Sequence, residues 1–310
     1  MNEQYAIIMF AGRKDRVKVG PKLANKLIGK DKNLKRSVFR LLLCVVWCGA
    51  LFNSVSVDAK IRSSVNRLVE GGKIIVKDVI DGDTVRLKKP VNSSREIRLV
   101  GIQAPKLPLG RKGFKAWPLA KESKKALEKL IKRKKLKIKY GGRRQDRHRR
   151  LLAHLYDQDN KWIQGELLRL GMARVYSFPD NRSQVAKMLK IERKARKAKR
   201  GIWDHSFYEI RTDEETSEHI GTFQLVRGKI SNAAKVRTRV YLNFGKNWRE
   251  DFTIMLRPRA RRYFKKAGIN PLEMKGETVL VRGWLRKRNG PMIEVTHPEQ
   301  IEVIKEKDGS

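Results

Sequence analysis

The sequence predicts a mainly β protein of the α+β class, with a five-stranded barrel of the OB type and three helices, followed by a second, smaller OB-like barrel. Between residues 72 and 206, three strand-like segments, a helix, two strands and further helices follow one another. A similar order returns between residues 221 and 305, without apparent sequence identity between the two halves. About 135 residues suffice for the first barrel to bury a core of its own.

The first three strands are predicted at 73–80, 84–87 and 95–102, where apolar and polar residues alternate. The sequence Asp-Gly-Asp-Thr at 81–84 forms a tight turn between the first and second strands. This layout places Asp83 beside Arg98 on a neighbouring strand.

The middle of the barrel alternates helices and strands. Apolar residues at helical spacing predict a helix over 119–131, and Pro118 fits its first turn. Strict alternation predicts a strand at 136–140, and another strand is predicted at 151–156. A short helix follows at 162–170.

The last helix of the first barrel is predicted at 181–200, with Asn181 or Ser183 as its N-cap and Gly201 after its end. It is strongly basic, so it is either a patch for nucleic acid or an anionic surface, or a solvated face. The basic residues concerned are Lys187, Lys190, Arg193, Lys194, Arg196, Lys197, Lys199 and Arg200.

The acidic stretch 207–220 breaks the basic composition and is interpreted as a linker. The second barrel, 221–305, is predicted to contain a helix at 258–267, and residues 306–310 are expected to be disordered. Its strands are predicted at 223–230, 239–244, 251–256, 278–285 and 292–295, with an edge at 301–303.

The N-terminal 59 residues resemble an export signal with a long basic n-region. An apolar run at 41–52 follows Lys35, Arg36 and Arg40 and gives way to small and polar residues ending at Ala59. The run is short for a membrane span, so we expect cleavage after Ala59, with an uncleaved membrane anchor as the alternative. The protein would then be periplasmic or secreted, and residues 60–71 would be a linker.

Composition points to an anionic partner. The chain of 310 residues has a formal net charge of +41, spread along its length. Nucleic acid, anionic lipid of the cell envelope and acidic polysaccharide are partners of that kind, whereas the bland interpretation is a general lysine bias. Both cysteines, Cys44 and Cys48, lie in the apolar run, which leaves no disulfide partner and no CxxC metal site after residue 59.

Several segments together resemble the thermonuclease, or staphylococcal-nuclease-like, family. The segments are DGDTV at 81–85, RLVGI at 98–102, DRHRRLLA at 146–153, WIQGELL at 162–168, GMARV at 171–175 and GIW at 201–203. The resemblance covers about residues 72–206. It implies an OB barrel that binds Ca²⁺ or another divalent cation and hydrolyses phosphodiester bonds in nucleic acid.

The resemblance also carries residue roles. It places the first metal-binding aspartate on Asp83 and the two phosphate-binding, catalytic arginines on Arg98 and Arg150. The second metal-binding aspartate falls on Gln103, a weak ligand, and the carbonyl donor falls on Ala104. The general-base glutamate falls on Lys106.

The replacements at Gln103 and Lys106 alter the expected chemistry. Calcium prefers several oxygen ligands, usually carboxylates, so a neutral Gln103 oxygen weakens the site. A protonated lysine cannot accept the proton of an attacking water, so the position of Lys106 marks a lost general base. Lys106 would instead add a positive charge to the phosphate site.

Two function hypotheses follow. The first is a metal-dependent phosphodiesterase of weakened or changed activity, acting on DNA or RNA. The second is a catalytically degenerate module that binds nucleic acid or another polyanion through Arg98, Arg150 and Lys106. A purely structural Asp83–Arg98 ion pair is the plain alternative.

Weaker candidates lie elsewhere. His148 in the basic loop is a candidate substitute base, set against the plainer interpretation of a solvated loop histidine, which is the more common kind. In the second barrel, Tyr241, Phe244 and Trp248 are candidates for base stacking, although the core is favoured for Tyr241 or Phe244. Trp248, between Asn247 and Arg249, is expected to be the surface ring.

Overall fold

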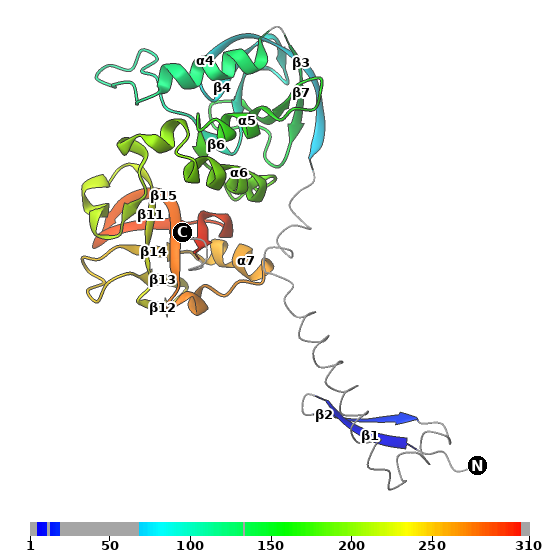
Figure 1. Ribbon diagram of the computed structural model, residues 1–310, viewed down its shortest axis with the longest axis vertical. Helices are drawn as coiled ribbons and strands as arrows, with labels where there is room; N and C mark the ends of the chain where they lie inside the picture. The colour runs from blue at the N-terminus through cyan, green and yellow to red at the C-terminus, as the bar shows by residue number, and fades with distance from the viewer. Residues whose placement is uncertain (1–4, 11–12, 19–67, 133, 305–310) are drawn as a thin grey trace. The chain divides into compact units, whose positions relative to one another are not determined.

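The computed structural model describes residues 5–10, 13–18, 68–132 and 134–304 and divides the chain into two units, 1–56 and 57–310. The first unit contains an antiparallel hairpin of β1 (Tyr5–Phe10) and β2 (Arg13–Lys18), which the sequence analysis did not predict (Figure 1). The apolar run at 41–52, the expected cleavage position and the tail 306–310 lie outside the described residues.

The second unit begins with a closed five-stranded barrel, which confirms the predicted fold class. Its strands follow the order β3-β4-β5-β8-β7. Their bounds are Val69–Asp81 for β3, Thr84–Val91 for β4, Ser94–Leu99 for β5, Lys135–Tyr140 for β7 and Leu151–Tyr156 for β8. Alternation explains the interior, because Leu151, Ala153 and Leu155 of β8 are all buried in the core.

Three helices accompany the barrel: α4 (Ala120–Ile131), α5 (Ile163–Arg169) and α6 (Val185–Lys197) (Figure 1). The buried residues of α4 fall at helical spacing and include Leu127 and Ile131. Two short strands, β6 (Ile102–Gln103) and β9 (Arg174–Val175), pair with each other. This pairing brings the GMARV segment next to the end of the RLVGI segment.

The N-cap prediction for α6 is wrong. The cap position is Gln184, with a φ of 67° and no side-chain cap hydrogen bond. Asn181 Nδ2 instead donates to the Arg143 carbonyl, and Ser183 Oγ donates to the Gly141 carbonyl. The two expected caps therefore fix the loop between β7 and β8. Pro118 likewise precedes α4, whose N-cap is Leu119.

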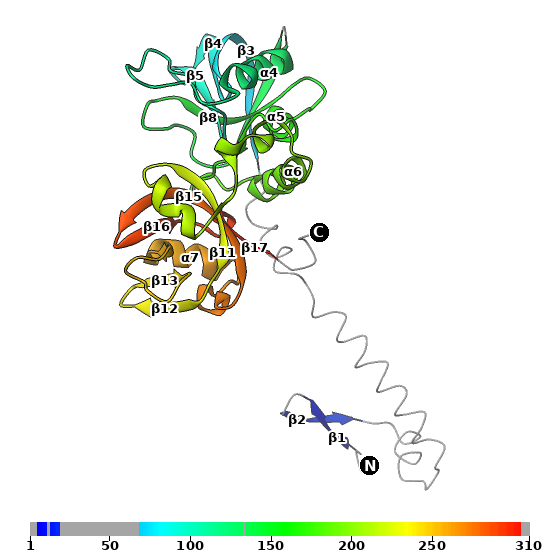
Figure 2. The same ribbon diagram turned by 60° about the vertical axis from the view of Figure 1, so that its left-hand side comes forward.

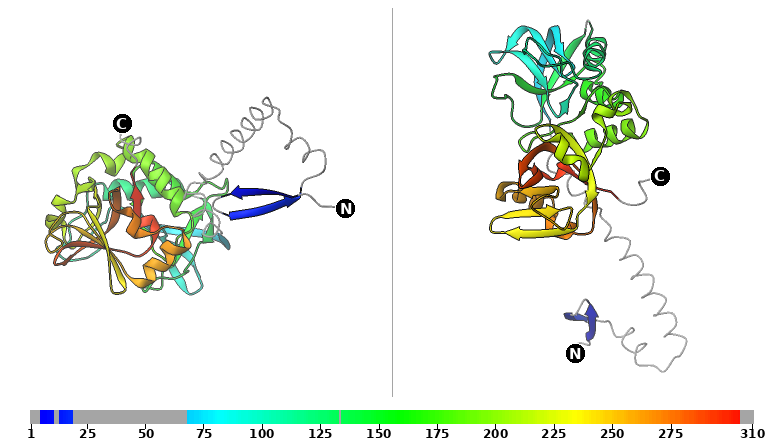
Figure 3. Two further views of the ribbon diagram at one scale, coloured as in Figure 1. Left: turned by 90° about the horizontal axis from the view of Figure 1, so that it is seen from below. Right: turned by 90° about the vertical axis from the view of Figure 1, so that its left-hand side faces the viewer.

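The second half is an eight-stranded curled sheet of order β10-β11-β15-β16-β14-β13-β12, with β17 paired to β15 (Figure 2). Helix α7 (Pro258–Lys266), orange in Figure 3, contacts β14. The strands β10 and β12 were not predicted. The strand bounds are Arg211–Thr212 for β10, Phe223–Lys229 for β11, Asn232–Val236 for β12, Arg239–Asn243 for β13, Thr253–Leu256 for β14, Thr278–Arg288 for β15, Gly290–Val295 for β16 and Ile301–Val303 for β17.

The acidic stretch 207–220 has local structure. Strand β10 lies within it and pairs in parallel with β11. Glu215 accepts a hydrogen bond from the Thr212 backbone N–H at 2.7 Å, so its acidic residues also order the backbone. Short 3₁₀ helices occur at Gly201–Asp204, Ser206–Tyr208, Glu214–His219, Pro271–Met274 and Pro298–Gln300.

A buried ion-pair network connects the barrel to the curled sheet. Arg282 of β15 is 1% exposed and pairs with Glu192 of α6 at 2.9 Å and with Glu302 of β17 at 2.5 Å. A second pair joins Arg182 to Glu299 at 2.8 Å. These contacts use charges from both halves, so the halves share a polar interface.

Among the described residues, we find no helix with the length and apolar character needed to span a membrane.

Candidate phosphate site

The centre of the site is Asp83, in the turn between β3 and β4. The turn needs glycine at Gly82, because a Cβ atom there would lie 2.0 Å from Ser123 Oγ and 2.7 Å from Ala104 Cβ. This close approach brings Ala104 against the turn, and its backbone N–H donates to Asp83 Oδ2 at 2.7 Å. Thr84 Oγ1 donates to Asp83 Oδ1 at 3.1 Å.

Lys106 places its ammonium against the Asp83 carboxylate. The Nζ atom lies 2.9 Å from Oδ1 and 2.7 Å from Oδ2 of Asp83. It also lies 3.4 Å from Oδ2 of Asp81, at the end of β3. A positive charge therefore sits between two buried carboxylates.

The two carboxylates respond differently to this environment. Burial would raise the pKa of Asp83, but Arg98 and Lys106 outweigh it and hold that pKa well below its usual range. For Asp81, burial and then the charge of Asp83 raise the pKa. Asp83 is thus the ionised partner of the two cations.

Gln103 does not face the same carboxylate. It lies on β6, opposite Arg174 of β9, and its Oε1 atom accepts a hydrogen bond from Arg174 Nε at 3.0 Å. Both side chains are buried, and burial lowers the pKa of Arg174 to about 10. The Gln103 carbonyl oxygen is therefore committed to a guanidinium.

These residues do not fit a calcium ion. Asp83 accepts five contacts through its two oxygens, from Thr84, Lys106, Arg98 and Ala104, so its lone pairs are already used. The described part of the chain holds no group of three or more His, Cys, Asp or Glu side chains suited to a metal. The Lys106 ammonium thus lies against the carboxylate that the resemblance assigns to Ca²⁺.

Arg98 of β5 is pinned beside Asp83. Its Nη2 atom lies 3.1 Å from Asp83 Oδ2 and donates to the Ile102 carbonyl at 2.7 Å. Its Nη1 atom donates to the Leu99 carbonyl at 2.7 Å and to the Asp83 carbonyl at 3.3 Å. Among the contacts of the described residues, its Nε–H is left for an incoming acceptor.

Arg150 is held by Asp146 in the loop before β8. Its Nε and Nη2 atoms lie 2.8 Å and 2.7 Å from Asp146 Oδ2, and its side chain is 29% exposed. Burial would raise the pKa of Asp146, but its hydrogen bonds from Arg150 lower it. The guanidinium is oriented and still accessible, as a phosphate donor requires.

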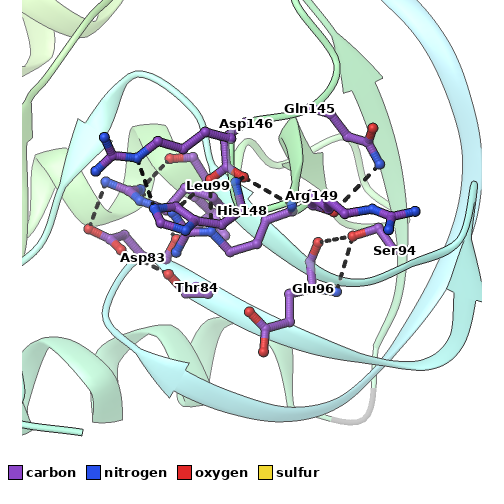
Figure 4. A network of polar contacts seen from close by, with 12 residues as sticks. Asp83, Thr84, Ser94, Glu96, Leu99, Gln145, Asp146, His148 and Arg149 are labelled. Atoms are coloured by element: carbon purple, nitrogen blue, oxygen red, sulfur yellow. Dashed lines mark hydrogen bonds and ion pairs between the residues drawn. The ribbon is translucent and has the colours of Figure 1, made fainter. Parts of the chain in front are cut away.

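Strand pairing places the two arginines on one face. Arg98 pairs with Leu152 in the parallel β5–β8 ladder, and Arg150 lies two residues before Leu152. Ile97 and Leu151 point into the core, so by alternation Arg98 and Arg150 project to the outer side. Figure 4 shows Asp83 and Thr84 in the same part of the barrel as Asp146 and His148.

Three residues of the site were not predicted from the sequence: Asp81, Asp146 and Arg174. Asp81 and Asp146 stood within the motifs and could have been found as carboxylates two and four residues from Asp83 and Arg150. Arg174 lies 71 residues from Gln103, and nothing in the local sequence indicates their contact.

The structure shows the exposure and contacts of the weaker candidates. His148 is exposed and its Nε2 atom accepts a hydrogen bond from Arg147 Nε at 3.1 Å. In the basic helix, Arg193 and Arg196 pair with Glu302, which removes part of that helix from a free basic face. Trp248 is 52% exposed and Phe244 is buried, as expected.

Comparisons with known proteins identify the family of this domain. A family model described as "Staphylococcal nuclease homologue" matches residues 96–205. The thermonuclease of Staphylococcus intermedius is 24% identical over 164 residues, which cover 53% of this chain and 95% of that protein. The SPbeta prophage-derived endonuclease YokF of Bacillus subtilis is 30% identical over 131 residues, 42% of this chain and 43% of that protein. The probable staphylococcal-like nuclease CAN1 of Oryza sativa is 34% identical over 107 residues, 34% of this chain and 28% of that protein, so the chain spans less than half of the latter two.

Proposed function

Since the chain contains a staphylococcal-nuclease-like domain, we propose that this domain binds nucleic acid through its phosphates, with the Lys106 ammonium in place of a divalent cation. The observation that carries the proposal is the position of Lys106 Nζ within 2.9 Å of both Asp83 oxygens. Hydrolysis would need a general base, and the residue at that position is a cation.

The remaining donors suit a phosphate. Arg150 is oriented by Asp146 and accessible, and Arg98 has its Nε–H turned to no described acceptor. Two guanidinium groups on one face can share the oxygens of one phosphodiester. The net charge of +41 adds a long-range attraction for the same polyanion.

The proposal is tested with the purified protein and a fluorescently labelled single-stranded DNA, by anisotropy in chelator and in excess calcium. We expect equal affinity in both buffers and intact DNA after prolonged incubation. Arg150→Ala should weaken binding by roughly tenfold or more, the worth of a charge-assisted hydrogen bond. Arg86→Ala, which removes the same charge from an exposed pair on β4, is the matched control and should weaken binding less. Binding that depends on calcium, or an equal effect of both variants, would overturn the proposal.

A second candidate function is weak metal-dependent hydrolysis of nucleic acid. Asp83, Arg98 and Arg150 lie at one site. The similar proteins of Staphylococcus intermedius and Bacillus subtilis are named as nucleases. The same incubation separates the two functions. Calcium-dependent cleavage that disappears in Arg150→Ala would establish hydrolysis, and Lys106 would then have to leave Asp83.

We propose further that the protein acts after export. The support is the apolar run at 41–52, with basic residues before it and Ala59 after it. N-terminal sequencing of the protein recovered from outside the cytoplasm tests the idea. A start at Lys60 would support cleavage, and an exported chain that still carries residues 41–52 would support the uncleaved membrane anchor. Recovery of the protein from the cytoplasm alone would contradict export.

A further inference from the structure

Four aromatic rings meet where the barrel contacts the curled sheet, and we call them the junction rings: Tyr176, Phe178, Phe223 and Trp284. Tyr176 lies 4.9 Å from Phe178 and 5.0 Å from Phe223 between ring centroids. Phe223 lies 6.3 Å from Trp284, whose Nε1 donates to the Tyr176 hydroxyl at 3.0 Å. The rings thus form one connected cluster from two parts of the chain.

Two of the junction rings are open to solvent. Phe178 is 47% exposed and Trp284 is 41% exposed, although both contact other rings. A hydrogen-bonded tryptophan beside an edge-packed phenylalanine is a fixed, partly uncovered apolar surface. Rings of this kind are preferred platforms for stacking against planar ligands.

Cations accompany these rings. On β15, Trp284, Arg286 and Arg288 are exposed at every second position, so they share one face of the strand. Arg286 is 64% exposed and lies 3.9 Å from Glu294, whose other oxygen pairs with Arg257 at 2.8 Å. Aromatic rings can stack against bases, and guanidinium groups can bind phosphates, so this surface suits a nucleic-acid strand.

Arg174 connects the junction rings to the phosphate site. Its guanidinium lies 4.6 Å from the ring centroid of Phe223, and its Nε donates to Gln103. Gln103 is followed by Ala104, whose N–H binds Asp83. The same guanidinium lies 5.8 Å from the ring of Trp117, which is in contact with the 41% exposed ring of Phe207.

We propose that the junction rings bind the bases of single-stranded nucleic acid whose phosphates are held at Arg98 and Arg150. This inference rests on the proposed function and names its substrate class. Bases are available for stacking in a single strand and are shielded in a duplex, so the surface selects the single strand. Gln103 does not act as a metal ligand here and instead positions Arg174 against the ring of Phe223.

The test compares single-stranded and duplex oligonucleotides of one length by anisotropy with the full chain. Trp284→Ala and Phe178→Ala should each weaken single-strand binding by about tenfold and leave duplex binding nearly unchanged. Trp284→Tyr keeps a ring and should retain most of the affinity. The control is Val236→Ala, because Val236 is 55% exposed in the same half and its truncation removes exposed apolar surface without removing a ring.

The outcomes separate this inference from the proposed function. If Arg150→Ala weakens binding but Trp284→Ala and Phe178→Ala do not, phosphate binding stands and base stacking on the junction rings is overturned. Equal losses in Trp284→Ala and Val236→Ala, or equal losses for single strand and duplex, would also overturn it. A wild-type chain that binds no nucleic acid overturns both ideas. Circular dichroism and melting temperature of each variant exclude unfolding as the cause.

Discussion

At the residue scale, Lys106 decides what the site can hold. An ammonium within 2.9 Å of both oxygens of a buried carboxylate neutralises it as a bound cation would. At the position where the resemblance places the general base, Lys106 also occupies the space between the carboxylates of Asp81 and Asp83. On the proposed function, this one residue removes both the base and the metal site.

Reversing that residue should create a metal site. In Lys106→Glu, a third carboxylate joins Asp81 and Asp83, and we expect Ca²⁺ binding measurable by calorimetry that the wild-type protein lacks. Lys134→Glu is the matched control, since Lys134 also pairs with an aspartate, Asp157, at 2.9 Å but has no second acidic neighbour like Asp81 in its described contacts. Equal calcium binding in wild type and Lys106→Glu would contradict the assignment.

Two buried histidines make stability depend on pH. Burial lowers the pKa of His154 to about 3, and burial together with Arg182 and Arg282 lowers that of His297 to about 3. Below about pH 6.5 these histidines bind protons in the unfolded chain but stay neutral in the folded chain. The free energy of unfolding is therefore highest above that pH and falls as the pH drops towards 3. The loss at about pH 5 is roughly 2 kcal/mol for each histidine.

Urea unfolding at neutral pH and at about pH 5 measures this loss. His154→Phe keeps a ring next to Trp162, whose centroid lies 5.6 Å away, and should reduce the pH-dependent loss by about half. An unchanged pH dependence in this variant would show that His154 titrates normally in the folded protein.

At the element scale, α6 and β15 are joined by a network that excludes water. Arg282 and Glu192 are both almost fully buried, so removal of the Glu192 charge takes away one of the two carboxylate partners of Arg282 and also the partner of Arg196 at 3.1 Å. We expect Glu192→Gln to lower the free energy of unfolding by roughly 3–5 kcal/mol. Denaturant titration followed by circular dichroism measures the change.

The control for this network is Arg193→Ala. Arg193 pairs with Glu302 at 2.7 Å but is 51% exposed, and exposed pairs contribute about 0–1 kcal/mol. Similar losses in Glu192→Gln and Arg193→Ala would mean that burial of the network does not determine its strength.

The elements that the sequence predicted are those with a strong local pattern. Strand β7 alternates strictly and lies within one residue of its predicted bounds, and α7 begins at Pro258, the first residue of the predicted helix. Strand β12 was missed because Asn232–Val236 is small and polar and is held by pairing with β13. The caps of α6 were wrong because Asn181 and Ser183 bind a loop about 40 residues away in the chain.

The site divides in the same way. Arg98 and Arg150 were found because they lie within short motifs, and the strand ladder places them together. The partners of Gln103 and Lys106 lie 71 and 23 residues away, so only the folded chain shows what these side chains do.

At the scale of the whole molecule, the net charge determines how we expect binding of nucleic acid to depend on salt. A formal net charge of +41 predicts that affinity for single-stranded DNA falls steeply as salt rises, because bound cations are released from the phosphates. Arg150→Ala should reduce the slope of log affinity against log salt by about 0.7, the worth of one phosphate contact on a single strand. An affinity that does not change with salt would rule out phosphate contacts as the main source of binding.

The tethered ammonium of Lys106 has a consequence for when the protein can work. A metal ion must be collected from the surroundings, and it can be withdrawn by a chelator or by a low ion supply. The Lys106 ammonium is covalently part of the protein, so it cannot dissociate from the site when the protein is diluted. On the proposed function, the domain binds its ligand as soon as it folds, in calcium-poor and calcium-rich compartments alike.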